Sequence, residues 1–231
     1  MEKILLPNLL QWALILIPMI VTGIIHLSLN RTTEKYNNVY AACGMTGADV
    51  ANLILQQNGI TNVSIEPIEG VLTDHYDPRS NVIRLSKGVY YSRSLTALGV
   101  AAHETGHAIQ HAVGYIPIKI RGFLVPVTNF STKLAMPIML IGMIFSLPML
   151  MDIGIWAYAI LALFQFVTLP VEFDASNRAL TILRTSNYLS DAETKDTRKV
   201  LTAAALTYVA AFFATAMTLA RLLLMRNNRR G

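Results

Sequence analysis

The sequence has few charged residues and a single cysteine. Charged side chains make up 14% of its 231 residues and hydrophobic ones 53%, whereas a soluble domain carries about a quarter charged residues. This shortage of charge argues against a soluble globular protein. The one cysteine, Cys43, excludes an intrachain disulfide and a cysteine-based zinc knuckle.

Positive charge exceeds negative charge, but it is not concentrated in one basic region. The formal net charge is +5, and the lysines and arginines are scattered or flank apolar runs. That distribution is typical of membrane-flanking segments. We therefore expect a lipid bilayer, and no nucleic acid, as a partner.

Four apolar runs each approach the roughly 17 to 25 residues that span a bilayer as a helix. The first is longer than the apolar stretch of a signal peptide and lacks a small-x-small cleavage site, so we interpret it as a retained anchor. The runs cover residues 4–30, 134–151, 153–171 and 201–220.

The region between the first two runs is long enough to fold as a small domain. Thr46, placed three residues before Asp49, is typical of a capped helix start, and Gly59 of its end. In order, the patterns predict a helix at 46–58, two or three short strands that include 63–66 and 81–86, and an alanine-rich helix at 94–112.

The alanine-rich helix contains His103-Glu104-Thr105-Gly106-His107, which fits the H-E-x-x-H pattern. Four residues are slightly more than one helical turn, so the two imidazoles lie on one face, about 6 Å apart along the axis, and can converge on one ion. Glu104 is rotated by about a quarter turn, which places its carboxylate beside the ion and not on it. The alternative is a chance pair of packed histidines. The apolar residues around them make that alternative costly, because buried imidazoles and a carboxylate need a partner.

A catalytic zinc ion takes three protein ligands and keeps one position open. Glu172 and Asp174 appear abruptly at the end of the third apolar run, and we choose Glu172 as the third ligand. The second and third runs are expected to form a hairpin that turns around Asp152, so Glu172 emerges on the same side of the membrane as His103. The alternative is that both acidic residues only mark the membrane boundary.

Three stretches together resemble the bacterial neutral zinc metallopeptidase family of YugP-type membrane proteases and, more distantly, the HtpX-type membrane proteases. The resemblance implies membrane embedding, one catalytic zinc bound by His103 and His107, and a glutamate ligand that falls on Glu172. HtpX-type relatives commonly have an aspartate four residues after that glutamate, where this chain has Ser176. Asp174 either replaces this aspartate or is itself the ligand. The stretches are LTDHYDP at 72–78, GVAAHETGHAIQ at 99–110 and TLPVEFDASNRAL at 168–180.

The expected fold class is an integral membrane, mainly α-helical protein with about four transmembrane helices and a small α+β zincin-like catalytic domain. Its expected parts are a transmembrane anchor at 1–30, the catalytic domain at 31–133, a transmembrane hairpin at 134–171, a segment with the third ligand at 172–200, a transmembrane helix at 201–225 and a basic tail at 226–231.

The expected function is that of a gluzincin-like zinc metalloendopeptidase, with Glu104 as the base that activates water. Other residues are expected to support the ligands or the oxyanion: Asp174, His75, Tyr76, Arg178 and His111. The strand at 81–86 is expected to offer an open edge for an extended substrate. The rival functions are a catalytically silent zinc-stabilised scaffold or partner-binding protein, which does not need Glu104, and a transporter, which the lack of paired charges in the spans disfavours.

The expected substrate is a protein or peptide, associated with the membrane because the site is tethered there. We expect a multi-pass protein of the cell membrane, and no sequence pattern indicates its oligomeric state. Basic residues near the catalytic segment outnumber the tail arginines Arg226, Arg229 and Arg230, so the positive-inside rule favours a cytoplasmic active site.

Overall fold

The computed structural model describes residues 2–145 and 147–228. The chain divides into two compact units, which we call the polar unit and the apolar unit. The polar unit comprises Leu27–Lys119 and Pro170–Leu206, and the apolar unit comprises Met1–His26, Ile120–Leu169 and Thr207–Gly231. Helices α1 (Glu2–Asn37), α5 (Ile116–Ile144), α6 (Pro148–Thr185) and α7 (Asp191–Asn228) contribute residues to both units.

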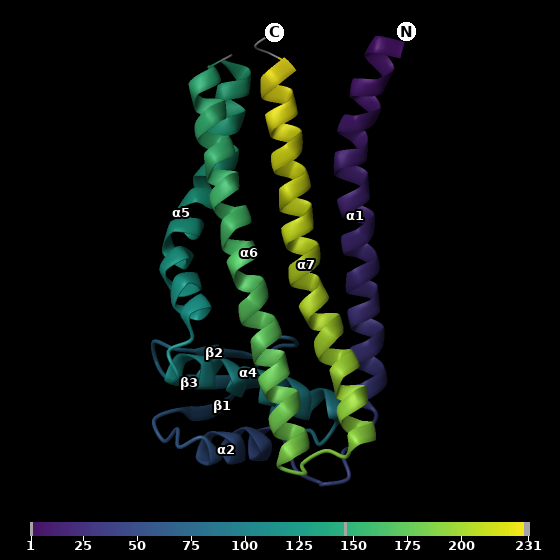
Figure 1. Cartoon of the computed structure of the whole chain (residues 1–231), viewed down its shortest axis with the longest axis vertical. Coiled ribbons are helices and arrows are strands. Elements are labelled where there is room, and N and C mark those ends of the chain that lie inside the picture. Colours follow the sequence, from purple (N-terminus) through teal and green to yellow (C-terminus); the bar gives the residue numbers. More distant parts are fainter. Residues whose placement is uncertain (1, 146, 229–231) are drawn as a thin grey trace. The chain divides into compact units, whose positions relative to one another are not determined.

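The other elements all belong to the polar unit (Figure 1). In chain order they are α2 (Gly47–Gln57), β1 (Ser64–Ile68), β2 (His75–Asp77), β3 (Val82–Ser86), α3 (Lys87–Tyr90) and α4 (Leu95–Ala112).

Side-chain caps define where α2 and α4 begin. The Thr46 hydroxyl accepts a hydrogen bond from the Asp49 backbone N–H, while the Thr46 N–H donates to the Asp49 carboxylate at 2.9 Å. The Ser94 hydroxyl accepts from the Ala97 N–H in the same way, at 3.1 Å. Such caps satisfy backbone donors that the first turn of a helix leaves without partners. Both helices predicted from the sequence are therefore confirmed, almost to the residue.

The three strands form one sheet in the order β1-β3-β2, with β3 parallel to β1 and antiparallel to β2 (Figure 1). The strand expected to offer an open edge is thus the central one, and that expectation was wrong. Burial explains the placement, because Val82, Ile83 and Leu85 are all buried and a strand of this kind belongs in the middle of a sheet. The outer strands are β1 and β2.

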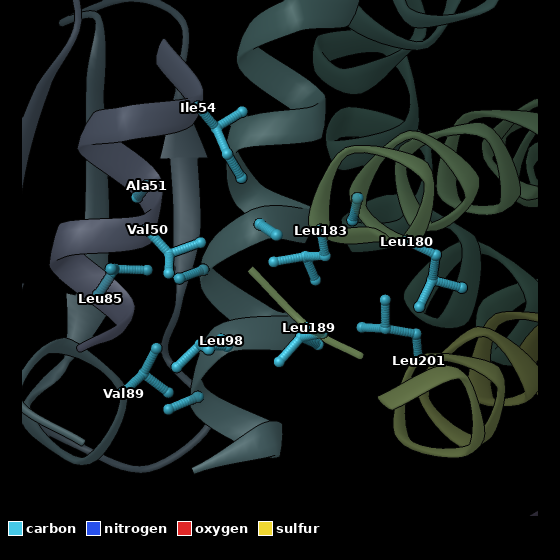
Figure 2. Packing of buried hydrophobic residues seen from close by; sticks show 14 of the residues in the cluster. Val50, Ala51, Ile54, Leu85, Val89, Leu98, Leu180, Leu183, Leu189 and Leu201 are labelled. Atoms are coloured by element: carbon cyan, nitrogen blue, oxygen red, sulfur yellow. The ribbon is translucent and has the colours of Figure 1, made fainter. Parts of the chain in front are cut away.

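The core of the polar unit is assembled from segments far apart in the sequence. Figure 2 shows Ile54 from α2, Leu98 from α4 and Leu183 from α6 among the buried side chains of one cluster. All three are fully buried. This cluster fixes α4 against α6, which positions the residues of the predicted site.

In the part of the chain that the structure describes, four helices are long and apolar enough to cross a membrane. These candidate spans are Leu9–Asn37, Ile116–Gly142, Pro148–Thr185 and Asp191–Asn227. Together with the small sheet, they confirm the predicted fold class.

The hairpin differs from its expected bounds. Helix α5 begins at Ile116, well before the predicted start of the second span, and α6 begins at Pro148, so Asp152 lies inside a helix and not at the turn. Its carboxylate accepts a hydrogen bond from Arg226 Nη2 at 2.9 Å. A paired carboxylate can lie within an apolar helix, so Asp152 did not need to mark the turn. Arg229 and Arg230, which entered the prediction of orientation, lie outside the described residues.

Candidate metal centre

Two histidines from α4 and one glutamate from α6 converge within the polar unit. His103 Nε2 lies 3.3 Å and His107 Nε2 3.7 Å from Glu172 Oε2. The two imidazole rings are 4.7 Å apart, centre to centre. One ligand atom from each of the three residues lies within 4.8 Å of the others, so the three could hold one metal ion.

Close packing of α4 on α6 makes this convergence possible. Gly106 lies between the two histidines in sequence, and a Cβ built there would lie 2.8 Å from the Ala175 carbonyl oxygen and 3.2 Å from its Cα. A side chain at this position would push the helices apart. The glycine of H-E-T-G-H is therefore the residue that lets the α6 backbone approach the histidine helix.

Burial and charge both suit a cation. Glu172 is 2% exposed and Glu104 and His107 are each 8% exposed, and a buried carboxylate is costly without a positive partner. Burial disfavours the charged imidazole of His107, but the carboxylates of Glu172 and then Glu104 outweigh it and raise the pKa of His107 above its ordinary value. Two imidazole nitrogens and a carboxylate oxygen are ligands typical of zinc, so the residues present fit that ion.

Each imidazole is held from behind by a different polar group. His103 Nδ1 lies 3.1 Å from the Ser176 hydroxyl, and His107 Nδ1 lies 3.0 Å from Gln110 Oε1. Sequence reasoning missed both roles. The spacing could have indicated that both residues lie near the ligands. Gln110 follows His107 by three residues and Ser176 follows Glu172 by four, and residues so spaced share a helix face.

Glu104, the predicted base, is not one of the three clustered residues. Its Oε2 accepts a hydrogen bond from the Tyr76 backbone N–H at 3.0 Å. Tyr76 is in β2, so this outer strand of the sheet lies against the buried carboxylate of α4.

The remaining candidates have other partners. Asp174 Oδ2 accepts from Gln110 Nε2 at 2.8 Å and from Arg178 Nε at 2.6 Å, so the structure brings Glu172, and not Asp174, to the histidines. The Arg178 guanidinium also lies 5.8 Å from the Tyr115 ring.

The other three candidates lie around β2. The Tyr76 ring packs edge-on against His111 at 5.5 Å, and its hydroxyl donates to Asn81. The exposed His75 ring contacts the Thr73 carbonyl oxygen at 2.7 Å. Tyr76 contacts the buried carboxylate of Glu104 through its backbone N–H.

Comparison with known proteins agrees with this donor set. Residues 11–227 match the family described as "Putative neutral zinc metallopeptidase". The chain belongs to this family. A relative from Bacillus subtilis (strain 168), the "Putative membrane protease YugP", is 44% identical over 197 residues, which are 85% of this chain and 88% of the relative. No solved structure matches. The predicted resemblance to the neutral zinc metallopeptidase family is confirmed, and the family and the four apolar helices together support a membrane protein.

Proposed function

We propose that the protein is a membrane-embedded zinc metalloendopeptidase in which His103, His107 and Glu172 bind the ion. The observation that carries the proposal is the convergence of two imidazole nitrogens, from the half-buried His103 and the buried His107, and one oxygen of the buried Glu172 within 4.8 Å. Membership of a zinc metallopeptidase family supports the same assignment.

A zinc ion in this cluster would supply Lewis acidity, which polarises the scissile carbonyl and lowers the pKa of the attacking water. Glu104 is the general base. Its carboxylate takes a proton from that water and then passes it to the leaving amine nitrogen. The hydrogen bond from Tyr76 N–H to Oε2 holds the carboxyl group in place, so the other oxygen is available for proton transfer.

The substrate docks on β2, the outer strand that lies against Glu104. Tyr76 pairs with Ile83 of β3, yet its N–H donates to Glu104, so this residue's backbone groups face away from the sheet. The Tyr76 carbonyl is therefore positioned to accept from an extended peptide. A Tyr76→Pro variant keeps the carbonyl but lacks the N–H that holds Glu104, so it tests the contact of β2 with the base: it should cleave less while zinc content stays unchanged. Tyr76→Phe is the control, and loss of zinc from Tyr76→Pro would show a purely structural strand.

The four apolar helices cross the bilayer as an anchor, a hairpin and a final span, with the catalytic domain between the first two. A 38-residue helix such as α6 is about 57 Å long, nearly twice the hydrocarbon thickness of a bilayer. Part of it must therefore leave the lipid. Glu172 lies beyond the first 20 residues of this helix. This supports a site at the membrane surface, where membrane-associated proteins are the accessible substrates. The positive-inside rule favours the cytoplasmic side for that surface.

Glu104→Gln tests the assignment of the base. The variant should lose at least about a hundredfold of the cleavage rate on an unfolded or membrane-protein substrate, because a general base contributes about 10²- to 10⁴-fold, and it should keep about one zinc per chain. Glu66→Gln, a change at a half-exposed position in β1, is the matched control. If wild type and Glu104→Gln both bind zinc and are equally inactive, the chain is a zinc-stabilised scaffold.

A further inference from the structure

Gln110 is a buried polar residue that the proposed reaction does not use. Its side chain is fully buried and makes three contacts of hydrogen-bond length. One joins Oε1 to His107 Nδ1 at 3.0 Å, and the other two join Nε2 to the Val171 carbonyl and to Asp174 Oδ2, both at 2.8 Å. The side chain thus links the histidine helix α4 to the glutamate helix α6.

These neighbours allow only one orientation of the amide. The two oxygens on the α6 side can only accept hydrogen bonds, so the NH₂ group of Gln110 must face them. The reverse orientation would place three oxygens together without a proton between them. The amide oxygen therefore faces His107.

An amide oxygen opposite Nδ1 determines which ring nitrogen carries the proton. Because Oε1 can only accept, His107 Nδ1 must be the donor, and the lone pair of the neutral ring is then on Nε2. Nε2 is the atom that faces Glu172. We infer that Gln110 is a positioning residue that fixes the Nδ1–H form of His107 and presents its Nε2 to the zinc ion; this inference rests on the proposed function.

The other histidine lacks this constraint. His103 Nδ1 lies against the Ser176 hydroxyl, which can donate or accept and so is compatible with either ring form. The two ligands of α4 thus differ, since one is oriented by a rigid, one-directional partner and the other by an adaptable one.

Asp174 completes the arrangement. Its carboxylate receives Gln110 Nε2 and Arg178 Nε through the same oxygen. Without that acceptor, the Gln110 amide would keep only the Val171 carbonyl and could turn more easily. Asp174 therefore acts on His107 indirectly: it holds Gln110, and Gln110 in turn orients His107.

Gln110→Met tests the inference, because methionine has a similar shape but lacks all three hydrogen bonds. Removing a group that orients a metal-binding histidine typically weakens metal affinity about 10- to 100-fold. We expect a loss of this size in zinc affinity, measured on the full-length protein in detergent by competition with a chromogenic chelator. The absorption spectrum of the cobalt-substituted protein should change with it, because cobalt absorption reports the ligand geometry.

The matched control is Gln57→Met. Gln57 is an exposed glutamine that joins α2 to the loop between α6 and α7, since it donates to the Tyr188 hydroxyl at 2.6 Å and accepts from Ser186 at 3.0 Å. Its substitution should lower the melting temperature but leave zinc affinity and the cobalt spectrum unchanged. If Gln110→Met matches Gln57→Met in both readouts while wild type binds zinc, the inference is wrong. If wild type binds no zinc, the proposed function fails as well.

A pair of variants at Asp174 keeps the test decisive should Gln110→Met fail to fold. Asp174→Asn retains an oxygen that can accept from Gln110, whereas Asp174→Ala does not. We expect Asp174→Ala to weaken zinc affinity about 2- to 10-fold, the equivalent of one hydrogen bond, and Asp174→Asn to restore it. An equal loss in both variants would instead make Asp174 a ligand, and no loss in either would exclude the positioning role.

Discussion

The polar and apolar units differ in how much of their large apolar side chains is exposed. In the polar unit, Leu95 and Leu98 of α4 are fully buried, while in the apolar unit Leu163 and Trp156 of α6 are 51% and 72% exposed. Water drives the burial of apolar surface in the first case. In lipid no such driving force exists, and apolar side chains can remain on the surface. His103, His107 and Glu172 all lie in the polar unit, where apolar side chains are buried.

Polar contacts show the same contrast. The polar unit has an extended network around His107, Gln110 and Asp174. In the described residues of the apolar unit, Arg226 donates to Asp152 and Arg221 donates to the neutral side chain of Gln11. A site that must orient two imidazoles gains from a connected network.

The largest expected effect is on the free energy of unfolding, when the same leucine-to-alanine substitution is made once in the polar unit and once in the apolar unit. Leu98→Ala should lower the free energy of unfolding by about 2–5 kcal/mol, because it leaves a cavity in a packed core. Leu163→Ala should change it by less than about 0.5 kcal/mol, as for other surface positions. Denaturant unfolding in detergent measures both, and equal losses would contradict the assignment of Leu163 to a lipid-facing surface.

A smaller effect is expected from adding one methyl group to a glycine. Gly106→Ala should cost about 1–3 kcal/mol, since the new Cβ meets the Ala175 backbone at 2.8 Å. Gly122→Ala in α5 is the matched change, because nothing lies within 4 Å of a Cβ there. It should be neutral or stabilising, given the better helix propensity of alanine. Thermal unfolding with intrinsic fluorescence compares them, and a neutral Gly106→Ala would show that α4 and α6 are not in close contact.

The smallest expected effect comes from Asp49, in the first turn of α2 in the polar unit. Hydrogen bonds from the Thr46 side chain and backbone lower the pKa of Asp49. A lowered folded-state pKa stabilises the protein above the ordinary aspartate value, and this contribution is lost as the pH falls through the lowered pKa. Asp49→Asn should therefore be less stable than wild type at pH 7 by about 1 kcal/mol or less. The difference should vanish in acid, and a difference that grew on acidification would contradict the capping role.

The sequence predicted those elements whose patterns are local. Helix α4 follows from its alanine-rich pattern, and the approach of Glu172 follows from the expected return of the chain through a hairpin. The central position of β3 was missed because a sheet order depends on long-range pairing. A third strand was allowed for, but β2 was not located because its three residues, His75 to Asp77, carry no periodicity.

The early start of α5 was missed for a different reason. Lys119, Arg121 and Pro126 resemble the composition of a polar loop, yet helical structure continues through them. The roles of Gln110 and Ser176 also escaped prediction, since spacing places them on the correct helix faces but only the contact of α4 with α6 reveals what they touch.

Zinc content of three variants tests the central claim most directly. Elemental analysis of purified, full-length Glu172→Ala, Asp174→Ala and Glu104→Gln would report the metal bound by each. The assignment of His103, His107 and Glu172 as ligands predicts loss of zinc from Glu172→Ala and retention of about one zinc per chain in the other two. Retention of zinc by Glu172→Ala together with loss from Asp174→Ala or Glu104→Gln would contradict it.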